Sequence, residues 1–174
     1  MRAAVLTMFI VGLAVPAAAQ TDNVVNPPPP VRSVNLSGPR FGFTSLSQGI
    51  VDKLQEEHDI TVRPGITQFG WQFEKQFYSK AGGVAAVNEF VFLLGGLEQG
   101  VTLPSASWMV GLRSPSGVEF GIGPNITPLG VGLVVAAGVT VRTGALNIPL
   151  NFALASSKSG PRVSIMTGFN LRRR

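Results

Sequence analysis

The amino-acid sequence predicts an all-β protein, an eight-stranded antiparallel up-and-down β-barrel with one short helix in the first loop. Between residues 39 and 171, short segments alternate apolar and polar residues, and glycine, proline, serine or asparagine separates these segments. The clearest segment is Gly130 to Thr143. Valine, leucine and alanine fill its odd positions up to 141, and small or polar residues fill every even position except Val134. Such a strand has one apolar face and one narrow, polar face.

Residues 1–19 have the organisation of a signal peptide. Arg2 precedes the apolar run Ala3 to Val15, which is followed by Pro16 and three alanines, so we expect cleavage after Ala19 and export of the chain. The alternative is an N-terminal membrane anchor, which needs about 20 apolar residues. Because the chain has no cysteine, it cannot be a lipoprotein, a disulfide scaffold or a thiolate enzyme.

Residues 20–38 form a proline-rich lead-in, with consecutive prolines at 27–30, and we expect this segment to be disordered. Residues 39–171 contain all the alternating segments and are assigned to one barrel, and residues 172–174 are a basic tail. The formal net charge is +5, but residues 39–171 carry nine basic and eight acidic side chains. The excess charge therefore lies at the chain ends, and the sequence predicts no face for nucleic acid.

The first predicted strand, Arg40 to Ser47, places phenylalanines opposite glycine and threonine. Gln48 to His58 follows it and has Ile50, Val51 and Leu54 three and four residues apart. This spacing predicts a short amphipathic helix within the loop that joins the first two strands.

Strand two, Ile66 to Tyr78, has the most regular aromatic face, which lies opposite glutamines and a glutamate. Lys75 falls on that aromatic face, so we expect it near a membrane interface, where its ammonium can reach water. Ser79 to Gly83 is a turn, and strand three, Val84 to Leu94, sets phenylalanines opposite Glu89. The end of strand three is apolar on both faces, which leaves its register open.

Strands four and five, Ser105 to Arg113 and Val118 to Ile126, form a hairpin through the turn Ser114 to Gly117. The loop Gly95 to Pro104 precedes this hairpin, and Pro128 ends strand five.

Strand six is Gly130 to Thr143, strand seven covers residues 147–154, and strand eight runs from Arg162 to Leu171. The alternative for Ile122 to Val141 is a transmembrane helix, because no charge interrupts this stretch. Two prolines and four glycines within it disfavour a helix, and its β-branched residues follow a two-residue period. We therefore interpret the stretch as parts of two strands.

The strands place their charged side chains on the face that also holds glycine, serine and asparagine. An eight-stranded barrel has room inside for packed side chains but not for an aqueous channel, so these charges are expected to pair and to plug the lumen. The predicted lumen ion-pair network consists of Arg40, Glu74, Glu89, Arg113, Glu119, Arg142 and Arg162. The aromatic side chains predicted to face lipid are Phe69, Trp71, Phe73, Phe90, Phe92, Trp108, Phe120, Phe152 and Phe169.

The reverse orientation is the alternative. A soluble periplasmic or secreted, lipocalin-like barrel would turn its apolar face inward and hold an apolar ligand there. Abundant glycine on the polar face favours the membrane orientation, because small residues relieve crowding in a narrow lumen. The residues that would hold the apolar ligand are Phe69, Trp71, Phe73, Phe90, Phe92 and Trp108.

The chain resembles the small eight-stranded outer-membrane barrels of Gram-negative bacteria and is similar to the transmembrane domain of outer membrane protein A. The resemblance rests on the architecture of Pro39 to Leu171 and on a last strand that ends in Phe169-Asn170-Leu171. The family usually ends on an aromatic residue, whereas Leu171 and three arginines end this chain. The resemblance implies an outer-membrane location, contact with outer-membrane lipid and recognition by the insertion machinery through the C-terminal strand. The loop of residues 46–65 would then face outside and be the most elaborate exposed surface.

The sequence predicts no catalytic constellation, cofactor or metal site. Lipid A deacylases are similar barrels that need a serine, a histidine and a carboxylate together, but His58, the one histidine, lies in the helical loop beside Glu57 and Asp59. Asp52 and Glu56 complete an acidic group there, which lacks a glycine-bearing calcium loop or a second histidine. We therefore expect a non-enzymatic barrel with a structural or surface-interaction role.

Overall fold

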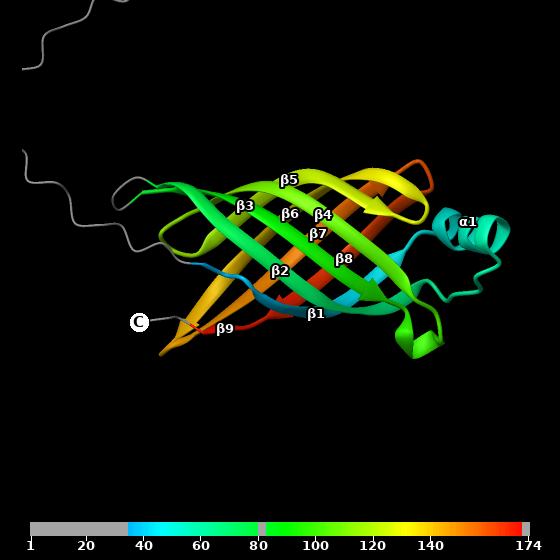
Figure 1. The fold of residues 1–174 in the computed structure, drawn as a ribbon, viewed down its shortest axis with the longest axis horizontal. Helices are drawn as coiled ribbons and strands as arrows, with labels where there is room; N and C mark the ends of the chain where they lie inside the picture. The colour runs from blue at the N-terminus through cyan, green and yellow to red at the C-terminus, as the bar shows by residue number, and fades with distance from the viewer. Residues whose placement is uncertain (1–34, 80–82, 172–174) are drawn as a thin grey trace, which may run out of the picture.

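A computed structural model describes residues 35–79 and 83–171, and it shows a closed barrel (Figure 1). It confirms the predicted eight antiparallel strands, the last of which has a one-residue break and is labelled β8 and β9. The helices are α1, Gln48–His58, and the 3-10 helix η1, Leu97–Gln99. The strands are β1 Gly38–Leu46, β2 Gly65–Ser79, β3 Ala85–Gly95, β4 Leu103–Arg113, β5 Val118–Thr127, β6 Gly130–Thr143, β7 Leu146–Ser157, β8 Gly160–Gly168 and β9 Asn170–Leu171.

The strands follow one another around the barrel in chain order. Each pairs antiparallel with the next, from β1 to β8, and β1 also pairs with β8, which closes the sheet. β9 pairs with β7 in the register that β8 begins, because Leu150 faces Thr167 and Leu146 faces Leu171. Closure pairs every strand on both sides, which protects the edges that an open sheet would expose.

Predicted and observed elements differ mainly at their ends. The bounds of α1 and β6 are those predicted. β4 begins two residues earlier than predicted, because Pro104 pairs with Leu94 on the outer face and Leu103 is buried inside. β3 keeps one register to Gly95, which resolves the ambiguity of its apolar end.

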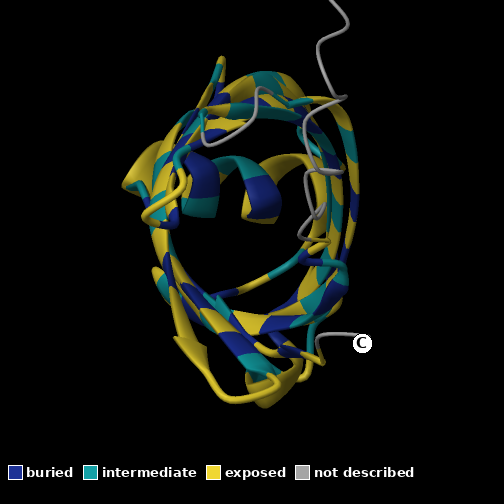
Figure 2. Ribbon diagram, turned by 90° about the vertical axis from the view of Figure 1, so that its left-hand side faces the viewer, coloured by how far each residue is buried: buried dark blue, intermediate teal, exposed yellow. Residues whose placement is uncertain are grey.

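Buried and exposed residues alternate along the strands, as the alternating colours of the ribbon in Figure 2 show, so one set faces the lumen and the other faces outward. In β6, Leu133 is 51% exposed, whereas Val134 and Ala136 are buried. Val134, the exception in the alternating sequence, is therefore a lumen residue. It belongs to a small apolar cluster with Met109, Ala136 and Ala155.

The two ends of the barrel differ (Figure 1). At the end that we call the terminal end, the described chain enters at Asn35 and finishes at Leu171. At the opposite end, the helix end, α1 and the longer connections are found. The connections at the helix end are residues 47–64, 96–102, 128–129 and 158–159.

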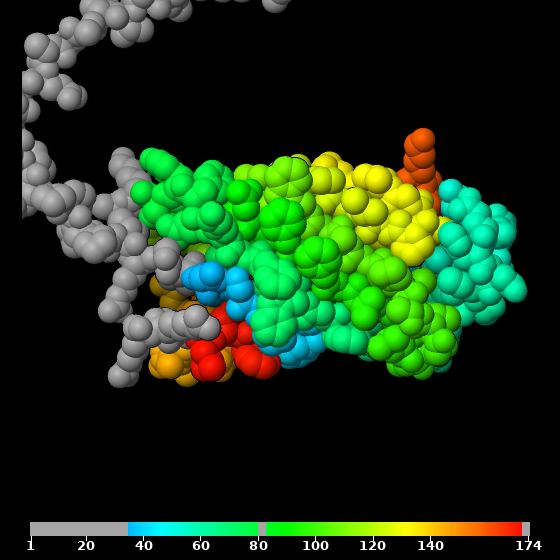
Figure 3. All heavy atoms as spheres, viewed as in Figure 1, coloured from blue at the N-terminus to red at the C-terminus, as the bar shows by residue number. Residues whose placement is uncertain are grey.

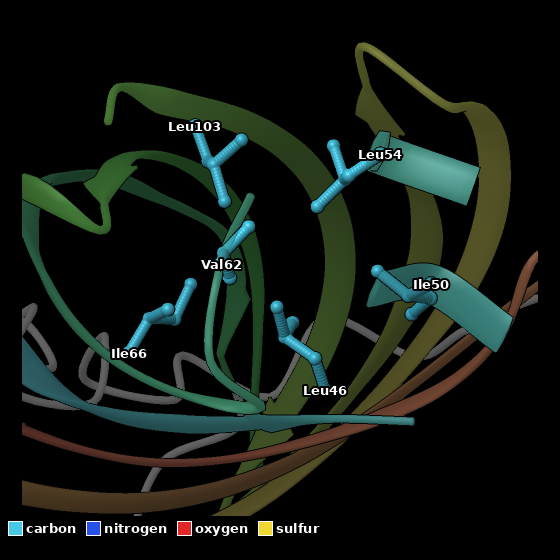
Figure 4. Packing of buried hydrophobic residues seen from close by; sticks show 6 residues of the cluster. All are labelled: Leu46, Ile50, Leu54, Val62, Ile66 and Leu103. Carbon is cyan, nitrogen blue, oxygen red and sulfur yellow. The ribbon is translucent and has the colours of Figure 1, made fainter. Parts of the chain in front are cut away.

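α1 lies across the mouth of the barrel at the helix end (Figure 2). Its Ile50 and Leu54 are 3% and 2% exposed, and they point toward side chains at the ends of the strands (Figure 4). Because both side chains are buried against the strand ends, we call α1 the lid of the barrel. The helix is 11 residues long, and within the described residues no helix has the length and apolar character needed to cross a membrane. The lid cluster consists of Leu46, Ile50, Leu54, Val62, Ile66 and Leu103.

Candidate functional site

The lumen near the terminal end contains a buried charged cluster centred on Arg113. Its Nη1 donates to Glu74 Oε1 at 2.7 Å, and its Nε donates to Glu119 Oε1 at 2.9 Å. The hydroxyl of Thr140 also donates to Glu119, at 2.7 Å. Arg113, Glu74 and Glu119 are 3%, 6% and 7% exposed. The Arg113 guanidinium, on β4, thus binds one carboxylate from β2, which is earlier in the sequence, and one from β5, which is later.

Arg40 lies in the same part of the lumen and is 3% exposed, but its hydrogen bonds go to neutral groups. Its Nε donates to Gln72 Oε1 at 3.0 Å, and its Nη2 donates to the Leu36 carbonyl at 2.7 Å. Its Nη1 donates to the Pro39 carbonyl at 3.0 Å. All three nitrogen atoms of the guanidinium therefore have partners, so the side chain is held in one position.

Glu89 is buried directly across the strand pair from Glu74. Within the described residues it forms no ion pair or hydrogen bond, and it faces the central cavity of the lumen. Two carboxylates that face each other repel, and Arg113 stabilises the Glu74 carboxylate directly. Glu89 is therefore the carboxylate that faces the cavity and that forms no ion pair with Arg113.

The other two predicted members lie elsewhere. Arg162 faces the lumen and donates a hydrogen bond to the side-chain oxygen of Asn125, away from the carboxylates. Arg142 occupies an even position of β6, like the lumen residues Val134 and Ala136, but it is exposed. It is the second-last residue of the strand, so its side chain leaves the lumen at the rim. The prediction that Arg142 pairs inside the barrel is therefore wrong, and among the described lumen residues the ion pairs join Arg113 to Glu74 and Glu119.

A cavity of about 70 Å³ lies in the lumen between the charged cluster and the lid. Arg40, Glu89 and Arg162 line part of it, and Met109, Val134 and other apolar side chains line the rest. A volume of this size has room for a few water molecules. The lumen is thus narrow and mostly filled by side chains.

Sequence reasoning missed Leu36 and Ser37, which precede the first strand. Leu36 is fully buried, and its N–H donates to Glu74 Oε1 at 3.2 Å. The backbone N–H of Glu74 donates to the Ser37 hydroxyl at 2.8 Å. An apolar residue just before the predicted strand was the available signal, but the nearby prolines favoured an extended lead-in. The remainder of that lead-in, residues 20–34, the signal peptide and the basic tail lie outside the described residues.

The outer face carries a continuous apolar belt. All nine aromatic residues predicted to face outward are exposed there, from 44% at Phe90 to 53% at Phe73. Phe90 and Trp108 stack with ring centroids 6.0 Å apart. Figure 3 shows that side chains of β2 to β5 cover this side of the barrel, with α1 at the helix end. Lys75 is on the same outer face, opposite Asn88 of β3.

The loop residues weighed as catalytic or metal-binding groups lie on the exposed side of α1. His58 is exposed in the last turn, and Lys53 pairs with Glu57 at 3.2 Å. The described residues contain no group of three or more His, Cys, Asp or Glu side chains placed to hold a metal ion. These residues form a solvated, charged helix surface.

No protein-family model, curated protein or solved structure matches the chain. The chemistry of the two surfaces therefore indicates what the barrel can do. Buried ion pairs inside it fix the positions of strands, and the exposed apolar belt outside it favours a nonpolar environment.

Proposed function

We propose that the protein is a non-enzymatic β-barrel of the bacterial outer membrane with a structural or surface-interaction role. The observation that carries the proposal is the placement of residues: aromatic and aliphatic side chains cover the outside, and charged groups are buried inside. Soluble monomers rarely expose apolar patches of more than a few hundred Å². A lipid environment removes the cost of that exposure, because the apolar side chains then contact acyl chains instead of water.

The height of the belt supports a transmembrane position. Along β6, outward apolar residues run from Val131 to Val141. Ten residue steps cover about 33 Å along a strand, or about 25 Å along the axis at a tilt of about 40°. This height matches the apolar band of outer-membrane barrels, which is about 25 Å.

The border of the belt near the terminal end has residues suited to a membrane interface. Lys75 and the 61%-exposed Tyr78 lie on the last part of β2. A lysine can extend its ammonium to water from the edge of an apolar layer, and tyrosine combines an apolar ring with a polar hydroxyl. Both are therefore compatible with the inner border of a membrane-spanning belt.

The alternative is a soluble, lipocalin-like barrel. The aromatic residues that would hold its apolar ligand, such as Phe69 and Trp108, lie on the outside, so the barrel would not enclose a ligand held among them. The cavity inside is small and is bordered by Glu89, Arg40 and Arg162. These two observations favour the membrane proposal over enclosed binding of an apolar ligand.

The resemblance to outer-membrane barrels extends the proposal to assembly. In the last strand, Val163, Ile165, Phe169 and Leu171 lie on the outer face, with exposures from 36% to 75%. This pattern supports recognition of the C-terminal strand by the outer-membrane insertion machinery. The charged outer side of α1 is the surface most accessible to a partner at the helix end.

Cell fractionation tests the proposed location. We expect the mature chain to sediment with outer membranes, to need detergent for extraction and to migrate faster in electrophoresis before heating than after it. The lipocalin-like alternative predicts release with the aqueous periplasmic or secreted fraction, without detergent. Recovery of a folded, monomeric chain in that fraction would exclude the membrane proposal.

A further inference from the structure

We propose that Leu36 and Ser37 form a built-in plug that closes the terminal end of the lumen, and that their release admits small solutes to the central cavity while the barrel stays folded. The plug is a property of the barrel itself. It goes beyond the proposed location and can be tested in detergent.

The plug is bonded to the charged cluster. The Leu36 N–H donates to Glu74 Oε1 at 3.2 Å, and the Leu36 carbonyl accepts from Arg40 Nη2 at 2.7 Å. One buried carboxylate and one buried guanidinium therefore hold the two sides of the same peptide segment. Because Glu74 also pairs with Arg113, the plug and the ion pairs share a residue.

The backbone after the plug passes very close to the last strand. The Asn170 side-chain amide donates to the Ser37 carbonyl. A Cβ at Gly38 would lie 2.5 Å from Asn170 Nδ2 and 2.6 Å from the Phe169 carbonyl oxygen, so only glycine fits there without displacement. Gly38 thus brings the chain against β9 just where it enters the barrel.

The plug differs from the barrel wall in how it is held. Residues 35–37 belong to no strand, whereas β1 pairs with β2 and β8 over most of its length. Segments outside the strand ladders open at a lower free energy than the ladders themselves. Release of residues 35–37 therefore does not require the barrel to unfold.

At the helix end, a different element covers the lumen. The lid cluster, with Ile50 and Leu54 buried beneath α1, covers the helix end. Toward the terminal end the cavity is lined by Arg40, whose Nη2 also holds the Leu36 carbonyl, so the plug reaches the cavity through the charged cluster. A solute that enters after removal of the plug must come through the terminal end.

A single introduced thiol can report this entry, because the chain contains no cysteine. Ala136 is buried and lines the cavity, so Ala136→Cys places a thiol inside the lumen. The probe is the silver ion, which is small and reacts with thiols. We compare the mature Ala136→Cys chain with two truncations of it, one without residues 20–34, which keeps the plug, and one without residues 20–37, which removes it.

We expect the thiol to react at the same slow rate in the mature chain and in the truncation that keeps the plug. Removal of residues 20–37 should raise the rate about tenfold or more, because it opens the cavity to solvent. Ala137→Cys, on the outer face of the same strand, serves as the matched control, and its rate should be equal in all three chains.

Unheated electrophoretic mobility verifies that each variant is folded. If the chain without residues 20–37 does not fold, the double variant Leu36→Gly, Ser37→Gly in the mature chain replaces it. Equal rates at position 136 with and without the plug would overturn the proposal, because solute would then enter by the helix end. A fast rate in the intact chain would overturn it as well.

Discussion

Arg113 is the residue on which the charged cluster of the lumen depends. It is the partner of two buried carboxylates, Glu74 and Glu119, which lie on different strands. A buried ion pair need not stabilise a protein relative to apolar residues of the same size, but removal of one partner leaves an unpaired charge inside. Arg113, on β4, therefore ties its strand to the neighbouring β5 and, across β3, to β2.

Replacement of Arg113 tests this role. We expect Arg113→Met to lower the free energy of unfolding by about 3 to 5 kcal/mol, because both carboxylates lose their cation. The exposed Arg142→Met is the matched control and should change it by less than about 0.5 kcal/mol. Urea unfolding in detergent, followed by electrophoretic mobility, measures both. If both variants lost the same free energy of unfolding, Arg113 would contribute no more to stability than an exposed arginine does.

Glu98 provides a pH-dependent contact outside the barrel wall. The Thr67 hydroxyl and N–H donate to its carboxylate at 2.5 and 2.9 Å, and these hydrogen bonds lower the pKa of Glu98 to about 2. A carboxyl group with a lowered pKa stabilises the folded state above its ordinary pKa of 4.5, and this contribution is lost as the pH falls toward 2. The contact between η1 and β2 should therefore be complete at neutral pH and weaken only in strong acid.

Hydrogen exchange of the Thr67 amide measures that contact. We expect its protection, after correction for intrinsic exchange, to be constant above pH 5 and to fall between about pH 4.5 and 2. Glu98→Gln should remove the pH dependence and leave a weaker, neutral hydrogen bond. A protection that falls already at pH 6 in the native chain would contradict the assignment to Glu98.

The odd or even position of a residue in its strand predicts whether its charged side chain faces the lumen, but not which charged side chains pair. This position gives the face of the strand and not the height of the residue along the barrel axis. For this reason Arg113 and Arg142 looked equivalent, although one lies within the lumen and the other at its rim. Leu36 could not be found by parity, because it precedes the alternating pattern.

At the scale of elements, α1 shows how a loop becomes part of the barrel. Its helical spacing was visible in the sequence, and the structure adds that Ile50 and Leu54 bury their side chains in the mouth of the barrel. Amphipathic spacing indicates that a helix has an apolar face, but the surface that covers this face depends on strand ends far apart in the chain. The loop is thus a closure as well as an exposed surface.

A charge placed beneath the lid should release it. Leu54→Asp buries an unpaired carboxylate, so we expect α1 to detach while the strands remain paired. A glutamate-specific protease should then cleave after the exposed Glu56 or Glu57 about tenfold faster. Gln55→Asp adds the same charge at an exposed neighbouring position and should leave the rate unchanged. Equal cleavage of both variants would show that α1 is not held by its apolar face.

At the scale of the whole molecule, closure was predictable because eight segments share one alternation. An even number of antiparallel strands brings the first beside the last, and β1 pairs with β8 as this requires. The two closures of the lumen were not predictable, because α1 and Leu36 lie outside the alternating pattern and contact residues on strands far apart in the chain. The alternation describes the wall of the barrel, whereas α1 and Leu36 close its ends.

The position of the whole barrel in a bilayer yields the last prediction. Val135 lies near the middle of the outward run of β6, and Val141 lies near its terminal end. Val135→Arg should lower the free energy of unfolding in phosphatidylcholine vesicles by about 2 to 4 kcal/mol, and Val141→Arg by about 0 to 1, because the cost of a charge falls toward the interface. Urea titration of vesicle-bound protein measures the difference. Equal costs at the two positions would place the belt outside the apolar layer, since only a residue at the bilayer centre loses all access of its charge to water.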